Sequence, residues 1–325
     1  MDMKRIVAAV TAAALCAILF VLLTACGNRD QTPTAGTAAT TGDSGTASTP
    51  EQKDPVDTME QLTDVEGVLS VTGQTFSYSI RGAVAYKVLY ESENGKLAAD
   101  VVLPDDYYKE EKTYPVLIYF PQIGFYVENL ATDYAQNGII VIRPYARGRG
   151  ESEGTRDFGG QKDLADAQTL LRIFDSARFV QKAKIFVAGS SEGSVNALRL
   201  FAEDPEKRIS GCAVVDVIAD LPAFAAFRGE GVGNLMTALI GKTCEEAPGE
   251  YDLRSAVKFS EKLDRPILLL HFLQSPITSV EQTDAFYDLI RETNKSCTYY
   301  KIDELSGDFQ GESLQRLLSW IRRHD

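Results

Sequence analysis

Short, continuous apolar runs separated by helix-length segments are the feature of this sequence that most restricts its fold. Five such runs occur, at residues 116–120, 138–142, 183–189, 211–217 and 266–270. Strands that are apolar on both faces belong to a parallel sheet that helices cover on both sides. The segments between them predict helices at 127–136, 162–174, 192–202, 280–292 and 312–323, and a last strand at 296–302. The sequence therefore predicts an α/β domain with a mostly parallel central sheet.

The chain before and within this pattern contains two irregular parts. Apolar and polar residues alternate at 76–80, 83–89 and 96–103, and the turn pair Asn94-Gly95 predicts an N-terminal antiparallel hairpin. Residues 219–262 interrupt the alternation of strands and helices, so we interpret them as an insertion. The insertion either lies over the carboxyl ends of the strands, where open α/β sheets bind ligands, or is a surface excursion with no role in binding.

The first 26 residues have the pattern of an export signal. Lys4 and Arg5 precede an apolar run at 6–23, and small residues and Cys26 follow that run. This ending resembles a bacterial lipoprotein signal, which implies cleavage before Cys26 and attachment of a diacylglycerol to its thiol. The alternative is an uncleaved membrane helix, since about 18 apolar residues can just span a bilayer. The lipoprotein interpretation places the protein on the extracytoplasmic face of a bacterial cell membrane, anchored at Cys26.

A segment rich in Thr, Gly and Ala follows the signal. Residues 27–58 contain no aromatic residue, and Val56 is their single branched aliphatic residue. Such a chain cannot bury enough surface to offset its ordering entropy, so we expect a disordered tether. The expected organisation is a signal peptide at 1–25, a lipidated cysteine and tether at 26–58, and an α/β domain at 59–325.

Composition excludes several classes of partner and site. Thirty-three Lys and Arg against 46 Asp and Glu give a net charge of −13, which repels a phosphate backbone, so nucleic acid is not an expected partner. Five cysteines without Cys-x-x-Cys spacing and two histidines are too few for a zinc site or a dense disulfide framework. We expect no metal and no cofactor. Cys212 and Cys297 fall in predicted strands with another strand between them, so we interpret both as core residues.

A strand, a sharp turn and a helix are predicted around residue 191. The sequence there is Gly189-Ser190-Ser191-Glu192-Gly193. A Gly-x-Ser-x-Gly motif in this context lifts the central hydroxyl out of the sheet, and its glycines avoid collisions with the neighbouring backbone. The backbone N–H of Glu192 faces the amino end of the helix and can serve as an oxyanion donor. Ser191 is therefore the candidate nucleophile.

With these motifs in view, the chain from about residue 76 to 325 resembles an α/β-hydrolase, closest to the prolyl-oligopeptidase and dienelactone-hydrolase branches. The resemblance rests on four segments, at 114–119, 147–154, 189–193 and 266–271. It implies a nucleophile, an acid and a histidine at defined turns. The Arg-Gly-rich segment 147–154 could also be read as a phosphate loop. Its glycines are spaced one residue too far for a dinucleotide motif, and a structural turn is the better interpretation.

The sequence departs from this family where the partners of the serine should stand. After the run at 266–270 the family has His-Gly-x-x-Asp, and Ser275 stands at the acid position. After the last strand the family has a histidine in a Gly-rich turn, and here Gly307 or Asp308 takes that place. In the oxyanion loop Pro121-Gln122-Ile123 replaces His-Gly-Gly, and Pro121 has no N–H to donate, although a one-residue shift would let Gly124 supply a donor. Both the acid and the base are therefore expected to be missing.

Three other residues are candidates for the missing groups. His271 matches a histidine that is usually structural in relatives, so it would act as a base only if relocated. Asp308 would act as a base only if burial raised its pKa by several units. Asp216, at the end of the run 211–217, can replace the acid, but an acid without a base does not activate a serine. The other histidine, His324, ends the last predicted helix and is expected on the outside.

Two hypotheses of function follow. The first is a degenerate hydrolase, a membrane-anchored binding module whose crevice holds a peptide or an acyl or ester compound without turnover. The second is a working serine esterase or peptidase, in which Ser191 attacks, the Glu192 N–H stabilises the oxyanion, and His271 or Asp308 is the base. Loss of triad members typically lowers the rate by roughly 10⁴- to 10⁶-fold, so catalytic rates separate the two hypotheses.

Overall fold

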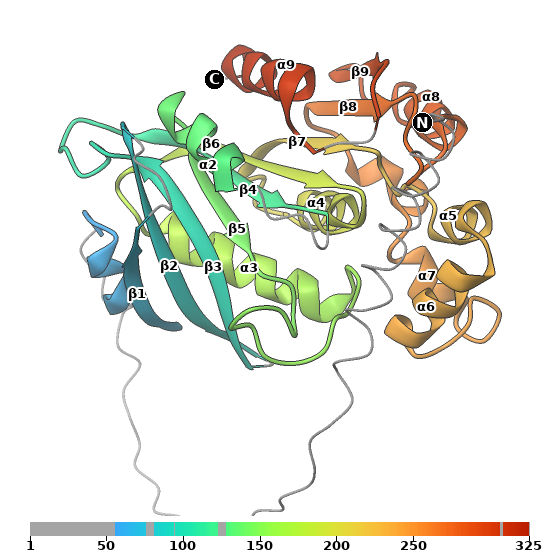
Figure 1. Cartoon of the computed structure of the whole chain (residues 1–325), viewed down its shortest axis with the longest axis horizontal. Coiled ribbons are helices and arrows are strands. Elements are labelled where there is room, and N and C mark those ends of the chain that lie inside the picture. Colours follow the sequence, from blue (N-terminus) through green and yellow to red (C-terminus); the bar gives the residue numbers. More distant parts are fainter. Residues whose placement is uncertain (1–55, 76–80, 94, 123–127, 306–307, 325) are drawn as a thin grey trace, which may run out of the picture. The chain divides into compact units, whose positions relative to one another are not determined.

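A nine-stranded sheet forms the middle layer of the computed structural model (Figure 1). The structure describes residues 56–75, 81–93, 95–122, 128–305 and 308–324. The strands lie in the order β1-β2-β3-β5-β4-β6-β7-β8-β9. Their bounds are Val68–Gln74 (β1), Ala83–Ser92 (β2), Gly95–Pro104 (β3), Tyr114–Phe120 (β4), Ile140–Pro144 (β5), Val180–Ser190 (β6), Ile209–Val215 (β7), Ile267–Phe272 (β8) and Cys297–Ile302 (β9). β1, β2 and β3 pair antiparallel, as do β3 and β5, whereas the strands from β5 to β9 in this order pair parallel.

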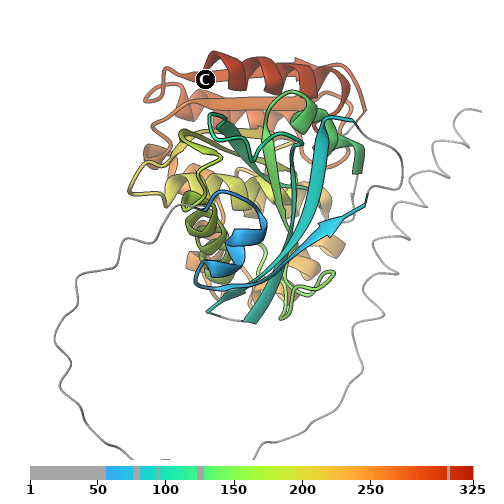
Figure 2. The ribbon, with the colours of Figure 1, turned by 90° about the vertical axis from the view of Figure 1, so that its left-hand side faces the viewer.

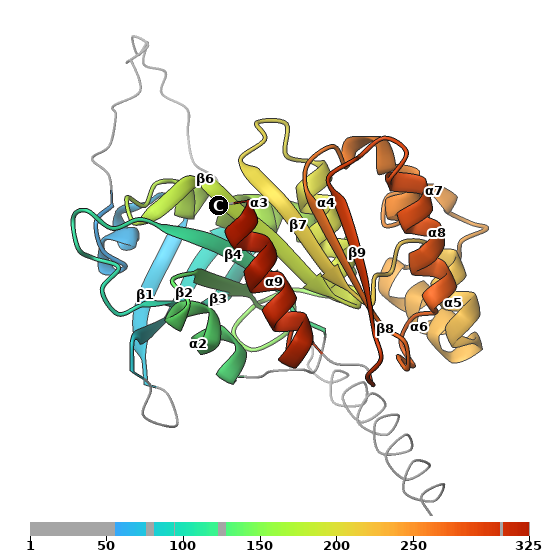
Figure 3. The same ribbon diagram turned by 90° about the horizontal axis from the view of Figure 1, so that it is seen from above.

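Helices cover both faces of the sheet. On one face lie α3 (Gln161–Asp175), α4 (Glu192–Ala202) and α8 (Val280–Ile290). On the other face lie α2 (Glu128–Gln136) and α9 (Gly311–Arg323), which Figure 3 shows in front of the sheet. The sequence of β4 is continuously apolar because both faces of the strand are buried. Val116 and Ile118 pack under the first group of helices, and Leu117 and Tyr119 pack under the second. The predicted parallel sheet with helices on both faces is confirmed.

The N-terminal hairpin is confirmed in β2 and β3, where Ser92 pairs with Gly95 at the turn. The antiparallel part also includes β1, which the sequence pattern did not predict; Figure 2 views the sheet from this edge. β1 is an edge strand whose residues are all exposed or only partly buried, so its sequence lacks a clear apolar face. The predicted strand at 76–80 and Asn94 lie outside the described residues.

The packed chain also begins before the expected boundary at residue 59. Val56 is buried and forms a β-bridge with Ala177, and a 3-10 helix, η1 (Glu60–Asp64), follows it. Val56 is the single branched aliphatic residue of the predicted tether, so the packed structure includes a residue that was predicted to be part of the tether. The predicted signal, Cys26 and residues up to 55 lie outside the described residues. No helix in the described part of the chain is both long and apolar enough to cross a bilayer.

The predicted insertion is helical. Residues 219–262 form α5 (Leu221–Arg228), α6 (Glu230–Ile240) and α7 (Pro248–Asp252), followed by the 3-10 helices η2 (Ala256–Lys258) and η3 (Ser260–Lys262). Figures 1 and 3 place α5, α6 and α7 together at one end of the sheet, near α8. Phe224 and Met236 from the insertion share a small core with Val195 of α4. The insertion is thus packed against the helix that follows Ser191.

Cys212 and Cys297 lie in strands, as the sequence predicts. Cys212 lies on β7 and Cys297 on β9, with β8 between them, and both are free thiols. Cys244 is also free and packs at the edge of the insertion core. Trp320 on α9 is fully buried and contacts the ring of Phe186 edge to face. These residues contribute to packing.

Candidate functional site

Ser191 lies in a sharp turn between β6 and α4. Its backbone angles are φ 50° and ψ −115°, a conformation that L-residues rarely adopt. The Ser191 N–H donates to the carbonyl oxygen of Val215 on β7, at 3.0 Å. The turn therefore has the strained backbone of a nucleophile elbow, held by the neighbouring strand.

The glycines that flank Ser191 permit a very close approach of backbone segments. A Cβ atom at Gly189 would overlap the carbonyl of Gly193, and a Cβ atom at Gly193 would overlap the carbonyl of Phe120 at the end of β4. The first turn of α4 is therefore packed directly on the end of β4. This contact fixes the position of the serine relative to the oxyanion loop that begins at Pro121.

Pro121 supplies no oxyanion donor on the β4 side, and residues 123–127 of this loop lie outside the described residues. Glu192 is the first residue of α4, so its N–H points out of the amino end of the helix. Pro121 follows Phe120 directly and has no N–H. Ser191 is 3% exposed, and its Oγ forms no hydrogen bond with any residue that the structure describes.

Asp308, one of the two candidates for the histidine position, contacts Ser190 and not Ser191; the other candidate, Gly307, lies outside the described residues. Asp308 Oδ1 accepts hydrogen bonds from the hydroxyls of Ser190 and Tyr119, and from the N–H of Phe309 at 2.9 Å. The two hydroxyl oxygens are 3.0 Å apart. All these groups are buried, and burial raises the pKa of Asp308 to about 7. The raised pKa that a carboxylate base would need is present, but on the neighbour of the candidate nucleophile.

His271 lies inside β8, which extends to Phe272, two residues further than the predicted run. Its Nδ1 is 3.0 Å from the Thr283 hydroxyl on α8 and 3.6 Å from the Asp216 carboxylate. Burial lowers the pKa of His271, so the neutral imidazole is favoured. Within the described residues, no hydrogen bond joins His271 to Ser191.

Asp216 follows β7 and has a φ of 48°. Its carboxylate accepts hydrogen bonds from the Phe272 N–H at 3.0 Å and from the Ser275 hydroxyl at 2.8 Å. Ser275, which stands at the family's acid position, is therefore bonded to a carboxylate from the neighbouring strand. The structure brings Asp216, Ser275 and His271 together, but among the described residues it does not connect them to Ser191 by hydrogen bonds.

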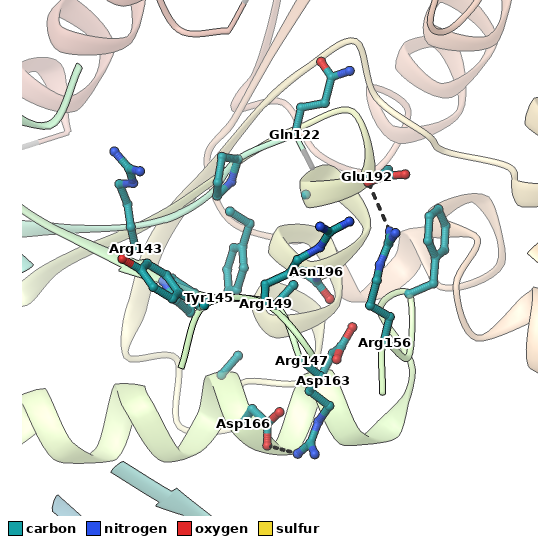
Figure 4. A pocket seen from close by; sticks show the side chains of 18 of the residues that line it. Gln122, Arg143, Tyr145, Arg147, Arg149, Arg156, Asp163, Asp166, Glu192 and Asn196 are labelled. Atoms are coloured by element: carbon teal, nitrogen blue, oxygen red, sulfur yellow. Dashed lines mark hydrogen bonds and ion pairs between the residues drawn. The ribbon is translucent and has the colours of Figure 1, made fainter. Parts of the chain in front are cut away.

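A cavity of about 300 Å³ adjoins the elbow (Figure 4). Its walls come from the end of β4, the segment after β5, α3, and the first turn of α4. Four arginines line it, namely Arg143, Arg147, Arg149 and Arg156. Sequence reasoning treated the 147–154 segment as a turn only, and Gly148, Gly150 and Gly154 do have positive φ. The signal that could have revealed the cavity is this spacing of arginines directly after a strand.

Comparisons with known proteins find one sequence relative and many similar folds. No family model matches the chain. It is 26% identical over 165 residues to the uncharacterized peptidase YtmA of Bacillus subtilis, a match that covers 50% of this chain and 62% of that protein. Dipeptidyl peptidase 4 of Porphyromonas gingivalis has a TM-score of 0.62 at 17% identity, over 75% of this chain and 36% of that one. Acetyl xylan esterase of Paenibacillus sp. R4 has a TM-score of 0.62 at 16% identity, over 82% of this chain and 92% of that one.

These similarities show that the chain has the α/β-hydrolase fold, as the sequence resemblance predicts. The similar structures are named as peptidases and esterases. The chain spans 62% of the curated relative and about a third of the dipeptidyl peptidase. The activities in those names therefore belong to those proteins.

The raised pKa of Asp308 predicts how stability depends on pH. Asp308 keeps its proton up to about pH 7 when folded but ionises near the ordinary aspartate pKa of 3.8 when unfolded, so the folded state binds more protons between these values. The free energy of unfolding should then fall as the pH rises from about 4 to about 7. Urea denaturation across this range should show a smaller fall for Asp308→Asn. If the free energy of unfolding fell equally with pH in the wild type and in Asp308→Asn, the raised pKa would not belong to Asp308. The other buried carboxyls contribute equally to both proteins.

Proposed function

We propose that this protein is a ligand-binding α/β-hydrolase-fold domain in which no histidine activates Ser191. The placement of the two histidines carries this proposal. The chain has two histidines in total. His271 Nδ1 is hydrogen-bonded to Thr283, and His324 Nδ1 donates to the carbonyl of Trp320 at the end of α9, at 2.8 Å. A serine hydroxyl is a weak nucleophile unless a base within hydrogen-bonding distance takes its proton.

The contacts of Asp308 support the same proposal. A carboxylate with a pKa of about 7 has the basicity that general-base catalysis requires near neutral pH. Its hydrogen bonds, however, go to Ser190, Tyr119 and the Phe309 N–H. Turning Asp308 toward Ser191 would leave these buried donors unsatisfied, at a cost of about 1–3 kcal/mol each.

The oxyanion side also favours binding over turnover. Pro121 supplies no N–H where relatives have a glycine-rich loop, and the loss of one such donor typically lowers the rate by about 10²- to 10³-fold. The similar structures act on peptides and esters by their names, so we propose a peptide or an acyl or ester compound as the class of ligand.

The proposal predicts that Ser191 contributes nothing to ester hydrolysis. Release of nitrophenol from nitrophenyl acetate should be equally slow for the wild type and Ser191→Ala, because no base accepts the serine proton. Ser296→Ala, which changes an exposed serine, serves as the matched control. A rate for the wild type well above that of Ser191→Ala would contradict the proposal.

A working serine hydrolase is the second candidate, and the strain at Ser191 favours it. A φ of 50° at a serine costs about 1–3 kcal/mol and serves no evident purpose in a site that only binds. If the ester assay shows a rate that depends on Ser191, the same assay on His271→Ala and Asp308→Ala identifies the base. The variant that removes the base would lose the rate, and the other would keep most of it.

We also propose that a lipid on Cys26 holds the domain at the extracytoplasmic face of a bacterial membrane. The support is the sequence alone, with Lys4 and Arg5, the apolar run at 6–23 and the small residues before Cys26. Two or three acyl chains would give stable anchoring, which a single chain does not.

The anchor predicts which cysteine is acylated. Cells grown with radiolabelled palmitate should label the wild-type protein and Cys16→Ala, which lies within the apolar run, but not Cys26→Ala. The mature protein should begin at Cys26. A mature chain that retains residues 1–25, or equal labelling of all three proteins, would contradict the lipoprotein proposal and favour the membrane helix.

A further inference from the structure

The cavity beside the elbow has the features of a site for a small organic anion. Its volume of about 300 Å³ is at the lower end of the range for small-molecule sites. Glu192 and Gly193, in the first turn of α4, form one wall, and Phe120 and Pro121, at the end of β4, form another. A ligand in this cavity would therefore lie next to the nucleophile elbow. Ser191 itself is not part of the lining.

Two of the four arginines are neutralised by carboxylates of the cavity wall. Arg147 is ion-paired with Asp166 at 2.5 Å, and both side chains are buried. Arg156 is ion-paired with Glu192 at 3.4 Å. Figure 4 marks both pairs with dashed lines. These arginines hold the wall together, and their charges are already compensated.

Arg149 differs from these two arginines. Its guanidinium makes no hydrogen bond or ion pair with any residue that the structure describes, although the residue is half-buried. In Figure 4 its side chain extends into the cavity toward Asn196 and the start of α4, whereas Arg143 points away from it. A half-buried cation without a protein partner attracts an anion more strongly than a fully solvated one does.

The remaining carboxyl of the lining does not compensate Arg149. Asp163 Oδ2 accepts the N–H of Gly159 at 2.8 Å, and no ion pair joins Asp163 to Arg149 in the described part of the chain. The lining has four arginines against three carboxyl groups, so it carries an excess of positive charge next to the amino end of α4. The partial positive charge of a helix amino end adds to the attraction for an anion.

The rest of the lining is apolar and aromatic. Tyr90, Phe120 and Phe158 contribute rings, and Pro121 and Pro144 contribute further apolar surface. A guanidinium pairs with a carboxylate through two parallel hydrogen bonds, and the rings suit an apolar body attached to it. The combination indicates an amphipathic ligand.

From these observations we infer that the cavity binds a small organic carboxylate with an apolar body, and that Arg149 recognises its charged group. This inference deepens the proposed function, because it names the charge of the ligand beside the elbow. The binding of a carboxylate here does not depend on whether Ser191 reacts, so the two proposals can fail separately.

The test compares charged and neutral ligands of one shape on the purified full chain. Titrations followed by ligand-observed NMR would use phenylacetate, its neutral counterpart phenylacetamide, and phenyl phosphate. Phenylacetate should bind at least about ten-fold more tightly than phenylacetamide, which is the size expected for a charge-assisted hydrogen bond. Phenyl phosphate should not bind more tightly than phenylacetate.

The variants assign the preference to one residue. Arg149→Gln should weaken phenylacetate binding about ten-fold and remove the preference over phenylacetamide. Arg323→Gln, at the exposed end of α9, is the matched control and should leave both affinities unchanged. Equal binding of phenylacetate and phenylacetamide, an unchanged affinity in Arg149→Gln, or no binding of phenylacetate would overturn the inference. Tighter binding of phenyl phosphate would overturn the carboxylate assignment. The ester assay above reports separately on Ser191.

Discussion

The close approach of α4 to the end of β4 is the constraint on which the rest of the site depends. Gly189 and Gly193 allow it, since any side chain at either position would overlap a backbone carbonyl. Ser191, between these two glycines, has a strained backbone, and the contact brings the first turn of α4 onto the end of β4. The same turn of α4 forms a wall of the cavity. One packing constraint therefore positions both the candidate nucleophile and the candidate binding site.

A carboxyl stands where the family pattern leads one to expect an imidazole. In the family pattern a histidine follows the last strand and reaches the serine at the elbow. Here the chain after β9 carries Asp308, which joins Ser190 on β6 to Tyr119 on β4. The three side chains connect segments that are far apart in sequence, beneath the elbow. On our account this buried cluster supports the turn and does not transfer a proton from Ser191.

The parts of the fold that the sequence predicts are those with local signals. Apolar runs and the helix starting at Glu192 depend on neighbouring residues, and the structure has that helix with the predicted bounds, Glu192–Ala202. β1 was missed because it is a partly exposed edge strand. The burial of Val56 was missed because a single bridge to Ala177, far along the chain, orders it.

In the site, too, the sequence predicts what depends on neighbouring residues and misses what depends on distant ones. The strained turn at Ser191 is a local motif, and the sequence identifies it. The partners of Asp308 and His271 depend on how distant strands pair, so the sequence can name these residues but not what they contact. Two of the four arginines that line the cavity, Arg147 and Arg149, come from the segment 147–154, which reads as a turn. Only the packing of that segment against α3 and α4 creates the enclosed space.

The central claim is that Ser191 lacks a base, and reaction with a fluorophosphonate probe tests it most directly. Such probes phosphonylate activated serines, and the adduct can be counted by mass spectrometry of the intact protein. Our account predicts no adduct on Ser191 under conditions that fully label a working serine hydrolase. Rapid incorporation of one probe per chain that Ser191→Ala abolishes would contradict it.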